Sequence, residues 1–165
     1  MAAPVLDAFG KLPAPRSGPV GCHPVMRGSV AMISAEQVIH RAGDEGVMPL
    51  ITLNEFFDGN DNEGSIAPNQ WGYGRPALAE LAERLRVIEQ REDVAWVRVQ
   101  LHPETMEMEE LAGEAVAICT TAGESVRAAW IEGLEASGTI PELVDVYRDI
   151  PAVPHGATVW SVMWD

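Results

Sequence analysis

Residues 94–101, VAWVRVQL, alternate between two kinds of side chain along one short stretch. Apolar residues take every second position, and a mixed set takes the positions between them: Ala95, Val97, Val99 and Leu101 against Trp96, Arg98 and Gln100. A period of two is typical of a β-strand with one face on the core. The next apolar run, Ala115–Thr121 (AVAICTT), has small apolar residues on both faces, as an interior strand would. Together the two runs predict the middle of a sheet.

Two helices are predicted beside these strands. Pro76 suits the first turn of one helix, whose apolar stripe is Leu78, Leu81, Ala82, Leu85 and Ile88. Thr121 and Glu124 have capping-box spacing ahead of the other, and Gly138 is placed to end it. Its expected buried stripe is Val126, Ala129, Trp130, Gly133 and Leu134. A shorter helix is expected to begin at Ser34 and end at Gly43.

The order of elements predicts the topology. Val47–Leu53 is an apolar, β-rich run, and residues 158–165 alternate as a closing strand. Residues 139–157 are expected to be mostly irregular, with a short helix around Glu142–Val146. The resulting βαββαβ order predicts an α+β, ferredoxin-like split βαβ sandwich, with an antiparallel sheet and two helices on one face. In that fold Val47–Leu53 and Ala115–Thr121 are the central strands.

Composition limits the classes of function. We expect one domain, residues 34–165, after an irregular or partly disordered arm, residues 1–33, that is rich in proline and glycine. The 25 acidic and 11 basic residues disfavour binding to nucleic acids and to anionic membranes. No apolar run reaches the ~20 residues of a membrane span, and the N-terminus lacks the apolar core of a signal peptide, so we expect a cytoplasmic protein.

One face of the predicted sheet lacks a helix layer. Trp96, Arg98 and Gln100 would lie there, and aromatic side chains on a bare face usually indicate a cover. The cover could be the N-terminal arm with the Ser34 helix, a second copy of the chain in a homodimer, or a ligand.

A polar loop, FFDGNDNEGSIAPN (residues 56–69), follows the first predicted strand. Asp58, Asn60 and Asn62 have the spacing of the first EF-hand ligands, but Glu63 stands where glycine is needed and Asn69 where the last glutamate is needed. Asp, Asn and Gly also stabilise turns by themselves, and we favour that explanation. Asp58, Asn60 and Asp61 are weak candidates for another cation site, and no cofactor is predicted.

Catalytic candidates are few. Ser65 lacks the G-x-S-x-G context of a nucleophile, and Cys119 lies within a predicted interior strand. Glu55 and His102 are weak candidates for a general base.

The segment TLNEFFDGNDNEGSIAPN (residues 52–69) carries the pattern E-x-F-x-G-N-[DN]-x-x-G-S-I. With the following helix and strands, it resembles a bacterial family of uncharacterised small proteins over roughly residues 50–165. The resemblance implies no known activity, cofactor or catalytic residue. It favours a purpose for the loop beyond joining two elements.

We therefore predict a non-catalytic binding or interaction module that self-associates as a dimer through its sheet face. Its partner would be a protein or a small ligand. The expected ligand or partner surface comprises Trp96, Arg98, Gln100, Phe57, Asn60 and Trp71. The alternative is a cation-dependent or carboxylate-dependent hydrolase that uses the acidic loop at residues 55–63.

Overall fold

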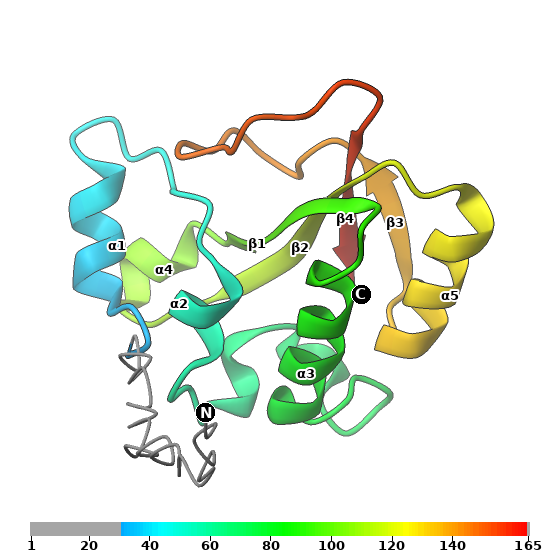
Figure 1. Cartoon of the computed structure of the whole chain (residues 1–165). Helices are drawn as coiled ribbons and strands as arrows, with labels where there is room; N and C mark the ends of the chain where they lie inside the picture. The colour runs from blue at the N-terminus through cyan, green and yellow to red at the C-terminus, as the bar shows by residue number, and fades with distance from the viewer. Residues whose placement is uncertain (1–30, 165) are drawn as a thin grey trace, which may run out of the picture.

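The computed structural model describes residues 31–164, which fold as a four-stranded antiparallel sheet with flanking helices (Figure 1). The α-helices are α1 (Ala35–Ala42), α2 (Leu53–Phe57), α3 (Leu78–Glu89), α4 (Glu104–Met108) and α5 (Glu124–Leu134), and the 3-10 helices are η1 (Glu63–Ser65) and η2 (Pro68–Gln70). The strands are β1 (Val94–Leu101), β2 (Gly113–Thr120), β3 (Gly138–Pro141) and β4 (Thr158–Met163). The α+β class is confirmed. Residues 1–30 of the predicted arm lie outside the described residues.

The sheet has the order β1-β2-β4-β3. Strands β1 and β2 match the two runs that predicted the middle of the sheet, and β2 is buried along nearly its whole length. A register shift between Val94 and Trp96 forms a bulge in β1. Ala95 therefore points outward, although the alternation placed it on the core face.

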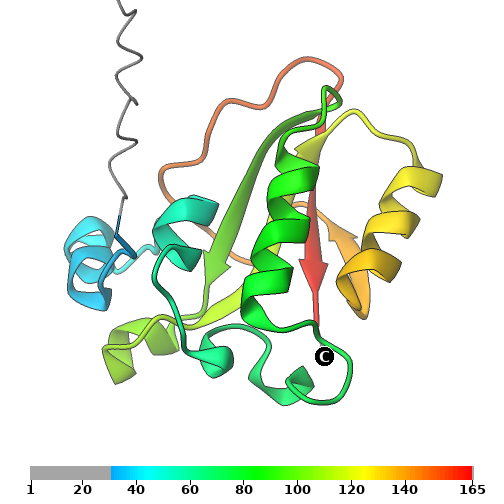
Figure 2. The same cartoon turned by 60° about the horizontal axis from the view of Figure 1, so that its bottom comes forward.

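Helix α3 lies across one face of the sheet, and α5 lies beside α3 on the side of β3 (Figures 1 and 2). The predicted stripe of α3 is buried in full. The predicted stripe of α5 is wrong in part, because only Trp130 and Leu134 are buried, while Ala129 and Gly133 are exposed. Since α5 sits at the flank of the layer, only a narrow strip of its surface meets the core.

Both predicted ends of α5 are also wrong. Gly123 is the N-cap, with no side-chain cap, and the Thr120 hydroxyl accepts a hydrogen bond from the Ala122 amide instead. The helix ends at Leu134 with Glu135 in a left-handed conformation. Gly138 then begins strand β3, which the sequence did not predict.

The segment Val47–Leu53 is not a central strand. Leu50 N–H donates to the Arg148 carbonyl at 2.9 Å, and Ile51 exchanges two hydrogen bonds with Val99 of β1. Pro49 has no N–H to donate, so a continuous ladder cannot form here. The segment thus extends the sheet by one bridge beyond β1, and β4 pairs with β2 in its place. The observed strand order is therefore not the ferredoxin-like one.

The second face of the sheet is covered by residues 142–157, the orange connection between β3 and β4 in Figure 1, which we call the strap. Trp96 Nε1 donates to the Ala152 carbonyl at 3.1 Å, and the Val144 amide donates to Gln100 Oε1 at 2.8 Å. The predicted helix around Glu142–Val146 does not form. The Ser34 helix, α1, contacts α4 at the side of the sheet rather than covering this face.

We predict that Ser161→Ala destabilises the fold by about 1–3 kcal/mol. The Ser161 hydroxyl donates to the Glu142 carbonyl and accepts from Gln100 Nε2, both at 2.7 Å. Its loss therefore leaves the Glu142 carbonyl and Gln100 Nε2 without this partner. Urea denaturation measures the change, with the exposed Ser125→Ala as the control expected within about 0.5 kcal/mol of the parent. Equal unfolding midpoints for the two variants would contradict the strap's dependence on this network.

Candidate functional site

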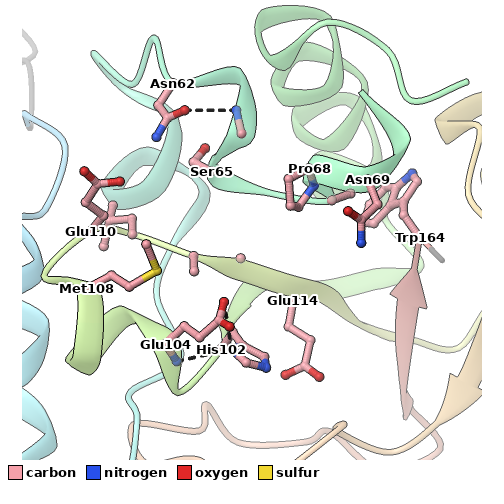
Figure 3. Close-up of a pocket in the computed structure, with 15 residues that line it drawn as sticks. Asn62, Ser65, Pro68, Asn69, His102, Glu104, Met108, Glu110, Glu114 and Trp164 are labelled. Carbon is pink, nitrogen blue, oxygen red and sulfur yellow. Dashed lines mark hydrogen bonds and ion pairs between the residues drawn. The ribbon is translucent and has the colours of Figure 1, made fainter. Parts of the chain in front are cut away.

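A cavity of about 400 Å³ lies between the polar loop and the connection from β1 to β2, and we call it the loop cleft (Figure 3). The loop contributes Asn62, Ser65 and Asn69 to its wall, and the opposite wall includes His102, Glu104 and Met108. Trp164 closes one end. The cleft thus joins residues that are far apart in the sequence.

The loop is held rigid by its own asparagines. Asn60 Nδ2 donates to the Phe56 carbonyl at 3.1 Å and to Ser65 Oγ at 3.0 Å, while Asn60 Oδ1 accepts from the Asn62 amide. Asn62 Oδ1 in turn accepts from the Gly64 amide at 2.9 Å. These are the side-chain turn bonds that favoured a structural explanation for this composition.

An apolar contact fixes the loop to the sheet. Ile66 is fully buried and forms a bridge with Gly113 at the start of β2. A Cβ atom on Gly113 would lie 3.0 Å from the Ile66 side chain, so this position needs glycine for close approach. The loop is therefore an ordered lobe against the body of the protein.

The loop's carboxylates mostly serve ion pairs. Asp58 pairs with Arg86 at 2.6 Å. Glu63 pairs with the buried Arg75 at 3.0 Å and accepts from the Leu78 amide at 2.9 Å, which caps the start of α3. Within residues 31–164, no group of three or more His, Cys, Asp or Glu side chains is arranged to hold a metal ion. Of the cation candidates, Asp58 is engaged by Arg86 and the Asn60 side chain is engaged by Phe56 and Ser65 of the loop.

Glu55 and His102 line different cavities. Glu55 lies with Arg41 beside a separate hollow next to α1, whereas His102 lines the loop cleft. His102 Nδ1 accepts a hydrogen bond from the Glu104 amide at 3.2 Å, which leaves Nε2 as the nitrogen that carries the proton in the neutral ring. The two candidate bases cannot act on one substrate atom in this arrangement.

Burial alone would raise the pKa of Glu55, but hydrogen bonds and charge outweigh it. The Thr52 amide and hydroxyl donate to its carboxylate, and Arg41 forms an ion pair with it at 2.9 Å, so the pKa is lowered from its usual value of 4.5. This carboxylate forms the capping box of α2, which explains its position without catalysis. Burial raises the pKa of the Cys119 thiol, which makes it a poor nucleophile.

The predicted partner surface is largely inaccessible. Trp96 is 5% exposed and Gln100 is 0% exposed, because the strap covers both. Phe57 is buried edge-to-face against Phe56. Asn60 is partly exposed and tied into the loop, as described above.

The remaining two members of that surface are more open. Arg98 is partly buried and lies 3.6 Å from Glu89. Trp71 is 43% exposed, with the Arg75 guanidinium 4.8 Å from its ring. Neither residue is among those that line the loop cleft.

Sequence reasoning missed Glu104, Met108 and Trp164 as lining residues. None of them belongs to a motif, and the Ile66–Gly113 bridge joins the polar loop to the start of β2. In the sequence, the polar loop at residues 56–69 was the signal that pointed to this region.

We predict that Asn60→Ala costs about 1–3 kcal/mol of unfolding free energy, because it removes three loop hydrogen bonds. Asn62→Ala removes one side-chain bond and should cost about 0.5–1.5 kcal/mol. Denaturant unfolding measures both, and amide hydrogen exchange at Ser65 should accelerate more in Asn60→Ala. The reverse order of the two variants would show that Asn60 does not organise the loop.

We also predict a pH-dependent contribution from Glu55. Its pKa is lower in the folded than in the unfolded protein, so its stabilisation is complete above the usual value of 4.5 and is lost as the pH falls through the lower, folded value. The difference in unfolding free energy between the parent and Glu55→Gln should therefore be largest at neutral pH and shrink in acid. Denaturation curves at a series of pH values test this, and a constant difference would refute it.

Comparison with known proteins gives a family but no activity. The model of the uncharacterised protein YfbO family matches residues 33–162 of the chain. This agrees with the expected resemblance to an uncharacterised family, without testing the loop motif. No curated protein and no solved structure matches the chain. Among the described residues, no helix is long and apolar enough to cross a membrane.

Proposed function

The chain belongs to the YfbO family of uncharacterised proteins, and we propose that it is a non-catalytic binding module for a small polar ligand in the loop cleft. The observation that carries the proposal is a preformed cavity whose loop wall is already ordered by Asn60 and Ile66. A rigid wall spares a ligand the entropy of ordering the loop on binding. Small-molecule sites are typically concave and largely preformed in this way.

The lining of the cleft suggests the chemistry of its ligand. Ser65 and Asn69 offer hydrogen bonds, and Trp164 offers an aromatic wall. The ionisable lining groups are His102 and the carboxylates of Glu104, Glu110 and Glu114. These carboxylates repel anions, so we expect neutral or cationic polar ligands.

Binding is better supported than the alternative of a hydrolase. Glu55, Asp58 and Glu63 are each engaged by an arginine, and Glu55 lies in a different hollow from His102. A hydrolytic pair needs both carboxylates near one bond of the substrate. The acidic loop therefore favours a scaffolding role over acid–base chemistry.

The proposal does not include a dimer through the sheet face. A second copy would first have to displace the strap from Trp96 and Gln100, and break the hydrogen bonds that hold it. The dimer itself stays a prediction.

The test is a ligand screen by two-dimensional ¹⁵N NMR with amino acids, amines, sugars, nucleosides and organic acids. We predict that binding compounds shift the amides of Ser65 and Gly113 and the indole of Trp164, and that organic anions do not bind. Ala112→Trp, which fills the cleft, should weaken binding by about tenfold or more. Ala95→Trp, at an exposed position outside the cleft, is the matched control and should leave affinity unchanged.

Equal affinity in the two tryptophan variants would refute the cleft as the site. A bound compound that is hydrolysed by the parent but not by His102→Gln would support the hydrolase instead.

A further inference from the structure

A second concave surface lies between α3 and α5, away from the loop cleft, and we call it the helix groove. It encloses about 540 Å³, and its apolar lining is Val87, Ile88, Ala129, Trp130, Gly133 and Leu134. Val87, on α3, is the large apolar side chain of this lining that is most exposed, at 63%. Figures 1 and 2 both show the two helices side by side.

Gly133 is the most informative position in this groove. It is the last residue but one of α5, in a turn where alanine is a better helix former than glycine. A Cβ atom there would meet nothing within 4 Å, so no internal contact demands a glycine. With Ala129 one turn earlier, also exposed, it leaves a shallow strip where another backbone can approach closely.

The charges around the groove identify the kind of partner. Glu83, Glu132 and Glu135 line it and are exposed, and within residues 31–164 none of the three carboxylates forms an ion pair. Arg84 is the only basic lining residue, and it is engaged by Glu80 and by the carbonyl of Gly133. The groove therefore has an apolar floor under a negative potential.

We propose that the helix groove binds an amphipathic helix of a partner protein, with an apolar face flanked by lysine or arginine. An apolar face would pack on Val87 and Ala129, and basic flanks would neutralise the three carboxylates. The C-terminal end of α5 adds to this preference, because the helix dipole is negative there. The helix groove is separate from the loop cleft, so this proposal does not depend on the proposed ligand site.

The test uses the full chain with a designed helical peptide of about 18 residues, long enough to be helical on binding, with leucine on one face and lysine on the other. A twin with glutamate in place of lysine is the charge control. We expect the lysine peptide to bind by calorimetry, more weakly at high salt, and to shift the NMR signals of Val87, Ala129, Gly133 and the Trp130 indole. The glutamate peptide should not bind.

Matched variants locate the contact. Ala129→Trp blocks the groove and should weaken the lysine peptide by about tenfold, whereas Ala128→Trp, exposed on the same helix but outside the groove, should stay within about twofold. Gly133→Gln projects into open space and gives a second block if Ala129→Trp fails to fold. Replacing Glu83, Glu132 and Glu135 by glutamine should weaken binding and flatten its salt dependence.

Three results would overturn the proposal. They are NMR shifts that map outside the helix groove, equal binding of the lysine and glutamate peptides, and equal affinities of Ala129→Trp and Ala128→Trp for the lysine peptide. A dimer in analytical ultracentrifugation that only the groove-blocking variants dissociate would show that a second copy occupies the groove, and would overturn the assignment of a basic partner.

Discussion

The structure depends on how the chain covers the second face of its own sheet. Helices occupy the first face, and the second face carries the large side chains of Trp96 and Gln100, which are buried under a cover. Gln100 determines how this cover is attached, because its buried side-chain amide needs hydrogen-bond partners. It finds them in Ser161 of β4 and in the Val144 amide of the strap, so an irregular connection is fixed on the sheet by polar bonds rather than by a helix stripe.

The strap also determines how the rest of the chain is arranged. Tyr147 donates to the Leu101 carbonyl at the end of β1, and Arg148 exchanges backbone hydrogen bonds with the segment that precedes α2. That segment reaches β1 through Ile51, so the strap, the first extended segment and β1 form one continuous set of backbone bonds. Burial raises the pKa of the Tyr147 phenol, with smaller contributions from nearby carboxylates, and keeps it neutral in this contact.

Periodicity predicted the elements whose burial is set by their own side chains. The alternation of residues 94–101 and the stripe of α3 each specify one buried face, and both were predicted with nearly the right limits. The prediction of a central strand at Val47–Leu53 was wrong, because apolar content shows that a segment is buried but not which strand it pairs with. The predicted buried stripe of α5 was wrong in part, because Ala129 and Gly133 fit an apolar pattern equally well when they face solvent.

The candidate site shows the same division. Composition correctly indicated that the loop is stabilised by side-chain turn bonds, since Asn60 and Asn62 act locally. Its neighbours across the loop cleft, Glu104 and Trp164, could not be predicted, because no sequence signal pairs them with Ser65. The strap was not among the covers predicted for the surface around Trp96, because an irregular segment carries no periodic pattern that would reveal it as a cover.

Charge connects the two proposed surfaces. Every arginine between residues 31 and 164 has a hydrogen-bond or ion-pair partner, such as Asp58 for Arg86 and the Ala122 carbonyl for Arg127. Acidic residues greatly outnumber basic ones, so the carboxylates left over determine the potential outside the protein. Both the loop cleft and the helix groove carry such carboxylates, and neither offers an unengaged arginine to an anion. Because these arginines are held in internal contacts, the two proposals agree on neutral or basic partners for the loop cleft and the helix groove.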